Sequence, residues 1–171
     1  MMAPLEIRLA DEQDLGAINS IYNYYVGCST TTYDNVLWTI DQRRRWWADR
    51  PAIHPVTVAC RDRQVVGWGA LNAFRGRPGY RWTVENSVYV DPKQLRRGVG
   101  ANLMRDLIDR AGDLGLRTIV AVVDAEQSAS VAIHRRFGFR EIGRLEQVGY
   151  KFDRWLDALL LQLLLPHRPA G

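Results

Sequence analysis

The sequence predicts a mixed α/β fold, a sheet flanked by helices, and three observations carry this prediction. Short apolar runs typical of strands alternate along the chain with stretches of helical periodicity. A long strand rich in β-branched and aromatic residues, Tyr80–Val90, precedes a glycine-containing turn and an amphipathic helix. The 171 residues, 47% of them hydrophobic, suffice for one domain with a real core and are few for two. We therefore expect a single domain over residues 3–166, followed by a flexible tail at residues 167–171.

The N-terminal third is expected to form one strand and two helices. Leu5–Leu9 alternates well enough for a strand, and Asp11 can cap the helix that follows it. That helix places a set of apolar residues on one face: Leu15, Ile18, Ile21, Tyr22 and Tyr25. After a hydroxyl-rich loop, Thr39 and Gln42 form a capping box that opens a second helix, which runs through about Arg50.

The middle of the chain is predicted to consist of strands. Val56–Cys60 and Val65–Phe74 are expected to be neighbours joined by a turn. The segment Arg75–Gly79 holds two glycines and a proline, so it cannot continue a strand and is expected to be a loop. Tyr80–Val90 then forms the long strand, which the following Asp-Pro pair ends.

The C-terminal half contains the clearest helix. From residue 99 to residue 114, one face is an apolar stripe: Val99, Leu103, Leu107, Ala111 and Leu114. Thr118–Val123 is a continuous apolar run typical of a strand that is buried on both faces. Ser128–Phe137 is expected to be helical. Phe139–Leu145 and Tyr150–Leu165 supply the last strands, although pattern alone does not separate strand from helix in a leucine-rich run.

The charged residues give little support for a nucleic-acid partner. The net charge is +4, and the 23 basic residues are all Arg except Lys93 and Lys151. The densest basic run, Arg43–Arg45, has Asp41 and Asp49 beside it, which is typical of a solvated helical face. The planar fork of arginine suits carboxylates and phosphates, so this bias permits an anionic ligand without requiring one.

Neither a metal site nor a membrane is indicated. Two cysteines, Cys28 and Cys60, do not make a disulfide framework or a metal site. The N-terminus lacks the basic and apolar segments of a signal peptide. The most apolar run, Leu156–Leu165, is too short to span a bilayer and contains Asp157 and Gln162. We therefore expect a soluble, cytoplasmic protein without a membrane partner.

The turn after the long strand has the features of an anion-binding site. A helix N-terminus exposes unpaired backbone N–H groups and carries a partial positive charge. Gly98 and Gly100 have no side chains to keep a phosphate away from those groups, and Arg96 and Arg97 add positive charge at the rim. A diphosphate fits such a place.

Three nucleotide motifs compete for this turn. A Walker loop needs Gly-Lys-Ser/Thr, which is missing, and a dinucleotide fingerprint needs a third glycine where the chain has Leu103. The remaining pattern, Gln/Arg-x-x-Gly-x-Gly/Ala after a long strand, fits Gln94 or Arg96 with the two glycines. Taken alone, a glycine-rich helix start is also compatible with a turn that binds nothing.

Several separate segments, in the right order, resemble the GNAT superfamily of N-acetyltransferases. Ser87–Ala101 with its helix resembles motif A of that family, and Asp124–Phe139 resembles motif B. Three segments resemble more narrowly its phosphinothricin and methionine-sulfone acetyltransferase branch: Tyr80–Val90, Ile133–Phe139 and Gln147–Asp157. The similarity runs from about Ile7 to Leu165.

The resemblance implies a mixed, mostly antiparallel twisted sheet whose splayed central strands hold acetyl-CoA as co-substrate. It implies cofactor contacts from the strand, the turn and the next helix: Val88, Tyr89, Val90, Arg96, Arg97, Gly98, Val99, Gly100, Ala101, Gln127 and Ser130. The branch usually has Asn at the position of Gln127, so this contact is expected to differ. Relatives form homodimers, and we expect one here, through the apolar C-terminal strands.

The resemblance also implies two catalytic residues. An ammonium has no lone pair, so acetyl transfer needs a group that takes a proton from the amine. The family uses a glutamate for this task, and Glu85 matches it. His134 stands where many members have Tyr, and we expect it to assist the leaving thiolate or relay protons. A strand N–H near Val88 could stabilise the oxyanion. A purely structural carboxylate and a histidine merely packed beside the cofactor are the alternatives.

Acceptor recognition is expected to come from a loop, the strand and the first helix-to-helix loop. The candidate residues are Arg75, Gly76, Arg77, Glu85, Asn86, Ser87, Thr30 and Tyr33. A carboxylate or sulfone favours a forked, permanently charged donor, and Arg75 and Arg77 match arginines of the branch. Solvated loop arginines are the alternative. Asn86 replaces a His common in methionine-sulfone enzymes, which leaves the exact amine open.

The predicted reaction is direct acetyl transfer from acetyl-CoA to the primary amine of a small amino-acid-like acceptor of the phosphinothricin, methionine sulfone or methionine sulfoximine type. Two other functions stay open at this point. The acceptor could be a protein N-terminus, which would need an open peptide groove, or the chain could be a non-catalytic acetyl-CoA-binding module.

Overall fold

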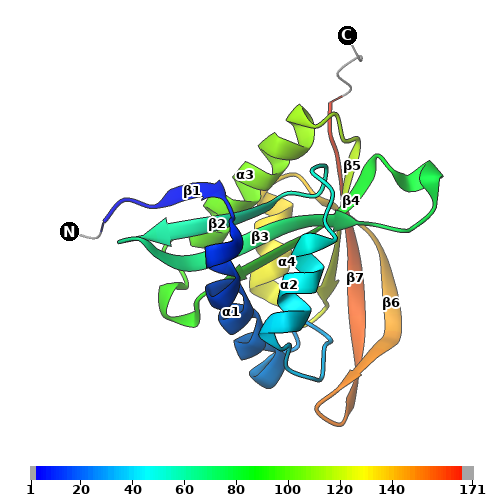
Figure 1. Ribbon diagram of the computed structural model, residues 1–171. Helices are drawn as coiled ribbons and strands as arrows, with labels where there is room; N and C mark the ends of the chain where they lie inside the picture. The colour runs from blue at the N-terminus through cyan, green and yellow to red at the C-terminus, as the bar shows by residue number, and fades with distance from the viewer. Residues whose placement is uncertain (1–2, 167–171) are drawn as a thin grey trace.

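The computed structural model describes residues 3–166, and it places seven strands in one sheet of order β1-β2-β3-β4-β5-β7-β6 (Figure 1). The strands are β1 (Glu6–Leu9), β2 (Val56–Arg61), β3 (Gln64–Ala73), β4 (Thr83–Val90), β5 (Thr118–Asp124), β6 (Arg140–Lys151) and β7 (Arg154–Leu164). The helices are α1 (Leu15–Cys28), α2 (Ile40–Ala48), α3 (Val99–Asp113) and α4 (Ser128–Arg136). The predicted tail at 167–171 lies outside the described residues.

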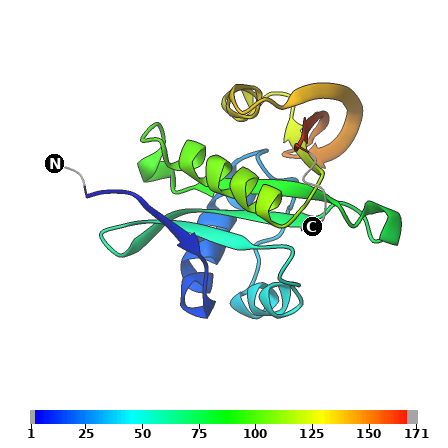
Figure 2. The same cartoon turned by 90° about the horizontal axis from the view of Figure 1, so that it is seen from above.

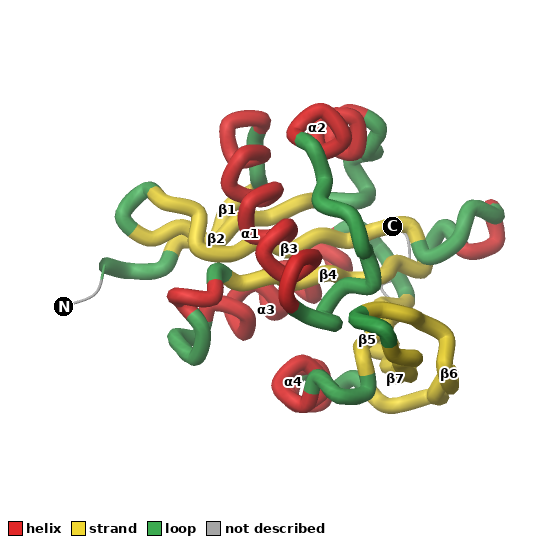
Figure 3. The backbone as a smooth tube through the Cα atoms, turned by 90° about the horizontal axis from the view of Figure 1, so that it is seen from below, coloured by secondary structure: helices red, strands yellow, loops and turns green. Residues whose placement is uncertain are grey.

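The helices cover both faces of the sheet. Seen from above and from below, α1 and α2 lie on one face and α3 and α4 on the other, while β6 and β7 curl away from the plane of the first strands (Figures 2 and 3). On the α3 face, Leu107 packs with Leu71 and Ile119 in one buried cluster. On the α1 face, Ile18 and Trp68 belong to a second cluster. Each face of the sheet thus has its own core.

The central strands β4 and β5 pair over a short distance only. They are the sheet's parallel pair, and their register covers Thr83–Glu85 against Thr118–Val120. Beyond that point β4 continues along β3 alone and β5 along β7 alone. All other neighbouring strands are antiparallel. The predicted mixed, mostly antiparallel sheet with parted central strands is confirmed.

Local signals in the sequence predicted most element boundaries. The capping box at α2 is present, since Thr39 Oγ1 accepts a hydrogen bond from Gln42 N at 3.2 Å. Asp11 caps a short 3-10 helix, Glu12–Asp14, and α1 begins after it rather than directly at the cap. The long strand begins at Thr83, because the preceding proline turn, Pro78–Tyr80, forms another 3-10 helix.

The leucine-rich C-terminal run is a strand, and β6 is longer than predicted. β6 has twelve residues and pairs with β7 in one hairpin, with register irregularities between Glu141 and Gly143 and between Leu145 and Gly149. Among residues 3–166, no helix has the length and apolar character that crossing a membrane requires.

The β6–β7 hairpin clamps the loop between α1 and α2. Lys151 Nζ donates hydrogen bonds to Ser29 O at 2.7 Å and to Thr32 O at 2.8 Å. Tyr33 Oη donates to Asp157 O at 2.9 Å. Gly149 lies directly against the Tyr33 ring, so close that a Cβ there would come within 2.5 Å of it. The loop is therefore fixed to the far edge of the sheet.

This close approach predicts that Gly149→Ala destabilises the protein. The added methyl must displace the Tyr33 ring, and overpacking of this kind costs about 1–3 kcal/mol. Gly143→Ala, in the same strand, is the matched control, because its Cβ would meet Leu160 Cδ1 at 3.9 Å. Denaturant unfolding of both variants is the measurement. Equal unfolding free energies for the two variants would contradict the packing described here.

Candidate active site

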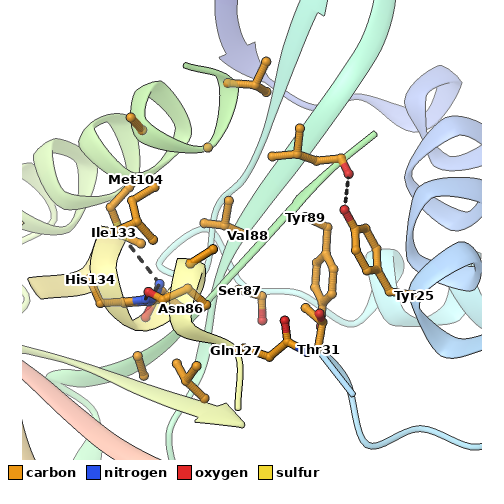
Figure 4. Close-up of a pocket in the computed structure, with 18 of the residues that line it drawn as sticks. Tyr25, Thr31, Asn86, Ser87, Val88, Tyr89, Met104, Gln127, Ile133 and His134 are labelled. Atoms are coloured by element: carbon orange, nitrogen blue, oxygen red, sulfur yellow. Dashed lines mark hydrogen bonds between the residues drawn. The ribbon is translucent and has the colours of Figure 1, made fainter. Parts of the chain in front are cut away.

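A cavity of about 730 Å³ opens where β4 and β5 part. Its walls come from β4, β5, the N-terminal turn of α3, α4 and the α1–α2 loop (Figure 4). This volume lies within the range that small-molecule and cofactor sites occupy, about 300–1,000 Å³. The cavity therefore provides a site for a sizeable ligand in the middle of the sheet.

The β4 edge facing the cavity carries backbone groups without a strand partner. Asp91 N donates to Val66 O, so the alternation of an antiparallel ladder turns the odd-numbered residues of β4 toward β3. The N–H and C=O groups of Asn86, Val88 and Val90 then face the side of β5. The pairing of Glu85 with Val120 still holds the N–H of Asn86, and the groups beyond it have no partner on β5. Tyr25 Oη donates to Val90 O at 2.6 Å. Asn86 and Val88 thus present main-chain groups to a ligand.

The N-terminus of α3 forms one end of the cavity. Its cap residue, Gly98, is left-handed with φ 79°, and Arg96 also has a positive φ of 61°. The first intrahelical bond runs from Asn102 N to Gly98 O, so the N–H groups of residues 99–101 have no partner inside the helix. These donors and the partial positive charge of the helix end favour an anion.

The arginines around this turn differ in their positions. Arg96 lines the cavity, whereas Arg97 does not and has one nitrogen 3.3 Å from Gln94 Oε1. Arg61, at the end of β2, donates to the same oxygen at 2.9 Å. Gln94 therefore gathers two guanidinium groups beside the helix end. Sequence patterns gave no signal for Arg61, since it lies 33 residues before Gln94.

Glu85 lies half-buried in the cavity wall on the α1–α2 face of the sheet. Within residues 3–166, no Lys, Arg or His forms an ion pair with its carboxylate. Burial raises the pKa of the Glu85 carboxyl above its ordinary value. A carboxylate in this setting is a stronger base than one in water.

His134 lies on the other face of β4, beside Asn86 (Figure 4). Its Nδ1 is 2.7 Å from Ser130 O, and its Nε2 is 3.0 Å from Asn86 Nδ2. A carbonyl only accepts, so Nδ1 carries the proton and Nε2 accepts from the Asn86 amide. Burial lowers the pKa of His134, although the hydrogen bond to Ser130 acts in the opposite direction.

This geometry bears on the role predicted for His134. The neutral imidazole has a single N–H, and the Ser130 carbonyl already holds it. Donation to a thiolate would first require a proton on Nε2, on the side of Asn86. Assistance to a leaving thiolate stays a prediction. The contact with His134 fixes the orientation of the Asn86 amide. The Oδ1 of that amide is buried and has no hydrogen-bond partner among the described residues.

Most of the residues predicted for the site do line this cavity. Glu85 and His134 are joined there by Asn86, Ser87, Val88, Tyr89, Val90, Arg96, Gly98, Val99, Gly100, Ala101, Gln127, Ser130 and Tyr33. Thr30 does not line it but accepts a hydrogen bond from Gln127 Nε2 at 3.0 Å, which joins α4 to the α1–α2 loop. Tyr25, Thr31 and Met104 also line it. Nothing in the sequence pattern separated these three from ordinary packing residues.

Three predicted acceptor-binding residues lie elsewhere. Arg75, Gly76 and Arg77 are exposed in the β3–β4 loop, which projects from the sheet (Figure 2), and none of them lines the cavity. The Arg75 guanidinium packs over the rings of Phe74 and Tyr80. The proline turn carries this loop away from β4. The three residues therefore lie outside the cavity, although they are close to Glu85 in the sequence.

No metal site accompanies the cavity: residues 3–166 contain no group of three or more His, Cys, Asp or Glu side chains arranged to hold a metal ion. The groups that converge on it are instead backbone donors, the carboxylates of Glu85 and Asp124, a neutral imidazole and several hydroxyls. This set suits binding of an organic anion and proton transfer.

Comparison with known proteins agrees with this arrangement. Residues 18–139 match the acetyltransferase (GNAT) family. The chain is 39% identical to the L-methionine sulfoximine/L-methionine sulfone acetyltransferase of Pseudomonas aeruginosa, with 96% of this chain and 97% of the relative covered.

Two solved structures have the same fold and contain the coenzyme. An acetyltransferase from Salmonella typhimurium with its cofactor acetyl-CoA has a TM-score of 0.92, at 35% identity over 97% of this chain and 96% of that one. A phosphinothricin acetyltransferase from Sinorhizobium meliloti in complex with acetyl-CoA has a TM-score of 0.91, at 32% identity over 94% of this chain and 88% of that one. The chain described here belongs to the GNAT family of acetyltransferases.

Proposed function

We propose that the protein transfers the acetyl group of acetyl-CoA to the primary amine of a small amino-acid-like acceptor. The observation that carries the proposal is the parting of β4 from β5, with unpaired main-chain groups along one wall and an isolated carboxylate beside them. Relatives named for methionine sulfoximine, methionine sulfone and phosphinothricin support this acceptor class.

The residues around the cavity fit the coenzyme. The unpaired N–H groups at the start of α3, together with Arg96, suit the diphosphate. The free C=O groups of Asn86 and Val88 suit the amide N–H groups of the pantetheine arm. When bound, acetyl-CoA would supply an activated acetyl thioester.

Glu85 is proposed to take the proton from the acceptor ammonium, directly or through water. Burial raises the pKa of Glu85, which makes it a better base than a carboxylate in water. The N–H of Val88 is proposed to donate to the carbonyl oxygen as negative charge develops there. Glu85 and Asn86 are consecutive in a strand, so their side chains point to opposite faces of β4. The acceptor and the His134 side would therefore lie on opposite faces.

A small acceptor is favoured over a protein N-terminus by the α1–α2 loop. This loop is bonded to the hairpin through Lys151 and to α4 through Gln127. A peptide needs an open groove in which its chain can continue beyond the reacting amine. The clamped loop closes that path with Thr31 and Tyr33, which line the cavity.

A homodimer is also proposed, through the β6–β7 hairpin at the edge of the sheet. Large apolar side chains are exposed there: Ile142, Val148, Trp155 and Leu164, each more than half exposed. Exposed apolar patches of this kind mark interaction sites, and an edge hairpin needs cover. We further propose a single domain over residues 3–166, because β3 and β4 contribute side chains to both buried clusters. We also propose a cytoplasmic location, because acetyl-CoA is an intracellular metabolite.

An acceptor screen tests the proposed reaction. Incubation with acetyl-CoA and methionine sulfone, methionine sulfoximine, phosphinothricin or the common amino acids should release free thiol with at least one of the first three. A parallel incubation with peptides, analysed by mass spectrometry, should give no N-terminal acetylation. Acetylation of peptides but of no small amine would overturn the proposal.

Glu85→Gln should separate activity from stability. Loss of the base should lower turnover by about 10²- to 10⁴-fold and leave acetyl-CoA binding intact. Because burial raises the Glu85 pKa, the ionised native form is destabilised, so the variant should unfold at a higher temperature at neutral pH. This difference should shrink as the pH falls below the raised pKa and vanish below the ordinary pKa of a glutamate, where the unfolded chain is neutral too. Glu12→Gln, at an exposed site, is the control and should change neither quantity.

Gly98→Ala should weaken acetyl-CoA binding. Gly98 has φ 79°, where an alanine is strained by about 1 kcal/mol or more, and the turn that presents the α3 N–H groups would shift. Gly112→Ala, near the other end of the same helix, has an ordinary φ and open space around its Cβ. Calorimetric titration with acetyl-CoA should show a higher Kd for the first variant alone. An unchanged Kd for Gly98→Ala would count against the diphosphate site.

A further inference from the structure

We infer that Arg50, Asn72 and Ser87 form a hydrogen-bonded relay that fixes the Ser87 hydroxyl as a donor to the carboxylate of the acceptor. The inference rests on the proposed function and deepens it, since it assigns the subsite that makes the enzyme select amino acids. Arg50 and Asn72 are positioning residues, because neither lines the cavity and both act through Ser87.

The relay begins at Arg50, just after α2. Its guanidinium packs 4.4 Å from the centre of the Trp46 ring. Nε donates to His54 O at 3.1 Å, Nη2 donates to Leu71 O, and Nη1 donates to Asn72 Oδ1 at 2.9 Å. The group is thus held in one orientation by bonds from all three of its nitrogens.

The second step fixes the Asn72 amide. Arginine has donors and no acceptor, so the atom that meets Arg50 must be the amide oxygen. The amide nitrogen then faces β4, where it donates to Ser87 Oγ at 3.1 Å and lies 3.4 Å from Glu85 O. The strand register agrees, because Asn72 pairs with Glu85 and is a diagonal neighbour of Ser87 on the same face.

The third step concerns the Ser87 proton. Since Ser87 Oγ accepts from Asn72, its own O–H must point elsewhere. Ser87 lines the cavity, and its side chain points toward the space beside Gln127 and Thr31 (Figure 4). The relay therefore delivers a hydrogen-bond donor to the acceptor half of the cavity.

The position of this donor matches an α-amino acid. Ser87 and Glu85 are two residues apart in one strand, so they share a face and lie about 7 Å apart along it. An ammonium bonded to Glu85 and a carboxylate oxygen bonded to Ser87 would span that separation. The β3–β4 loop arginines predicted to bind the carboxylate do not line the cavity, whereas Ser87 does.

The charge behind this wall also favours an anion. Arg43 is 2% exposed and enclosed by the rings of Tyr22, Trp38, Trp46 and Trp68. Within residues 3–166, neither Arg43 nor Arg50 forms an ion pair with a carboxylate. Two guanidinium groups without a direct ion pair therefore lie on the acceptor face of the sheet, and Asp34, bonded to Tyr22 and Trp38, is the carboxylate that acts on Arg43.

Asn72→Asp tests the relay by reversing its polarity. The aspartate keeps the size of Asn72 and can pair with Arg50, but it has only acceptors, so Ser87 must donate to it and turn its proton away from the cavity. The readout is the ratio of kcat/KM for methionine sulfone to that for 3-(methylsulfonyl)propylamine, the same amine without the carboxylate. Wild type should prefer the carboxylate substrate, and the variant should lose about 10- to 100-fold of this preference through KM.

Matched Ser87 variants keep the test independent of how Asn72→Asp folds. Ser87→Ala should lose the same preference, Ser87→Thr should retain it, and Ser87→Ala added to Asn72→Asp should cause no further loss. The KM for acetyl-CoA should not change. If wild type acetylates methionine sulfone and Ser87→Ala keeps the full preference, the relay is wrong and the proposed function stands. If wild type acetylates neither these two amines nor any other small amine of the acceptor screen, the proposed function itself fails.

Discussion

The site depends on one constraint, which is that β4 and β5 must stop pairing after three residues. An unpaired backbone group in a sheet is costly unless a ligand or water satisfies it. The strands on either side keep β4 and β5 in place. β3 pairs with β4 from Ala73 to Gly67, and the whole of β5 pairs with β7. The opening is therefore held by well-paired strands on either side rather than by a flexible loop.

A single strand serves both halves of the site. Alternation along β4 sends Asn86 toward α3 and α4, where His134 lies, and sends Glu85 and Ser87 toward α1 and α2. The backbone of the same residues faces the gap. Two ligands can thus approach from opposite faces of the sheet and meet at the open edge of β4. The two faces differ because α1 and α2 cover one and α3 and α4 cover the other (Figure 3).

Sequence reasoning succeeded where the signal was local. The apolar stripe of α3, the glycine turn before it and the capping box at Thr39 each lie within a few residues, and the structure has all three. It did not foresee that Arg75 and Arg77 lie outside the cavity, because their position depends on where a proline turn directs a loop. The contacts from Arg50 to Asn72 and from Asn72 to Ser87 join side chains that are far apart in the sequence. Hydrophobic periodicity cannot predict such contacts.

Lys151 has a structural role that the composition of the chain does not reveal. Almost every cation here is arginine, yet one of the two lysines lies buried with its ammonium bonded to two carbonyl oxygens of the α1–α2 loop. A tetrahedral head with three donors can bridge two carbonyls in a narrow space, whereas a flat guanidinium is wider and needs a planar arrangement of partners. In a protein whose cations are almost all arginine, this buried lysine occupies a place where shape, and not charge, decides the residue.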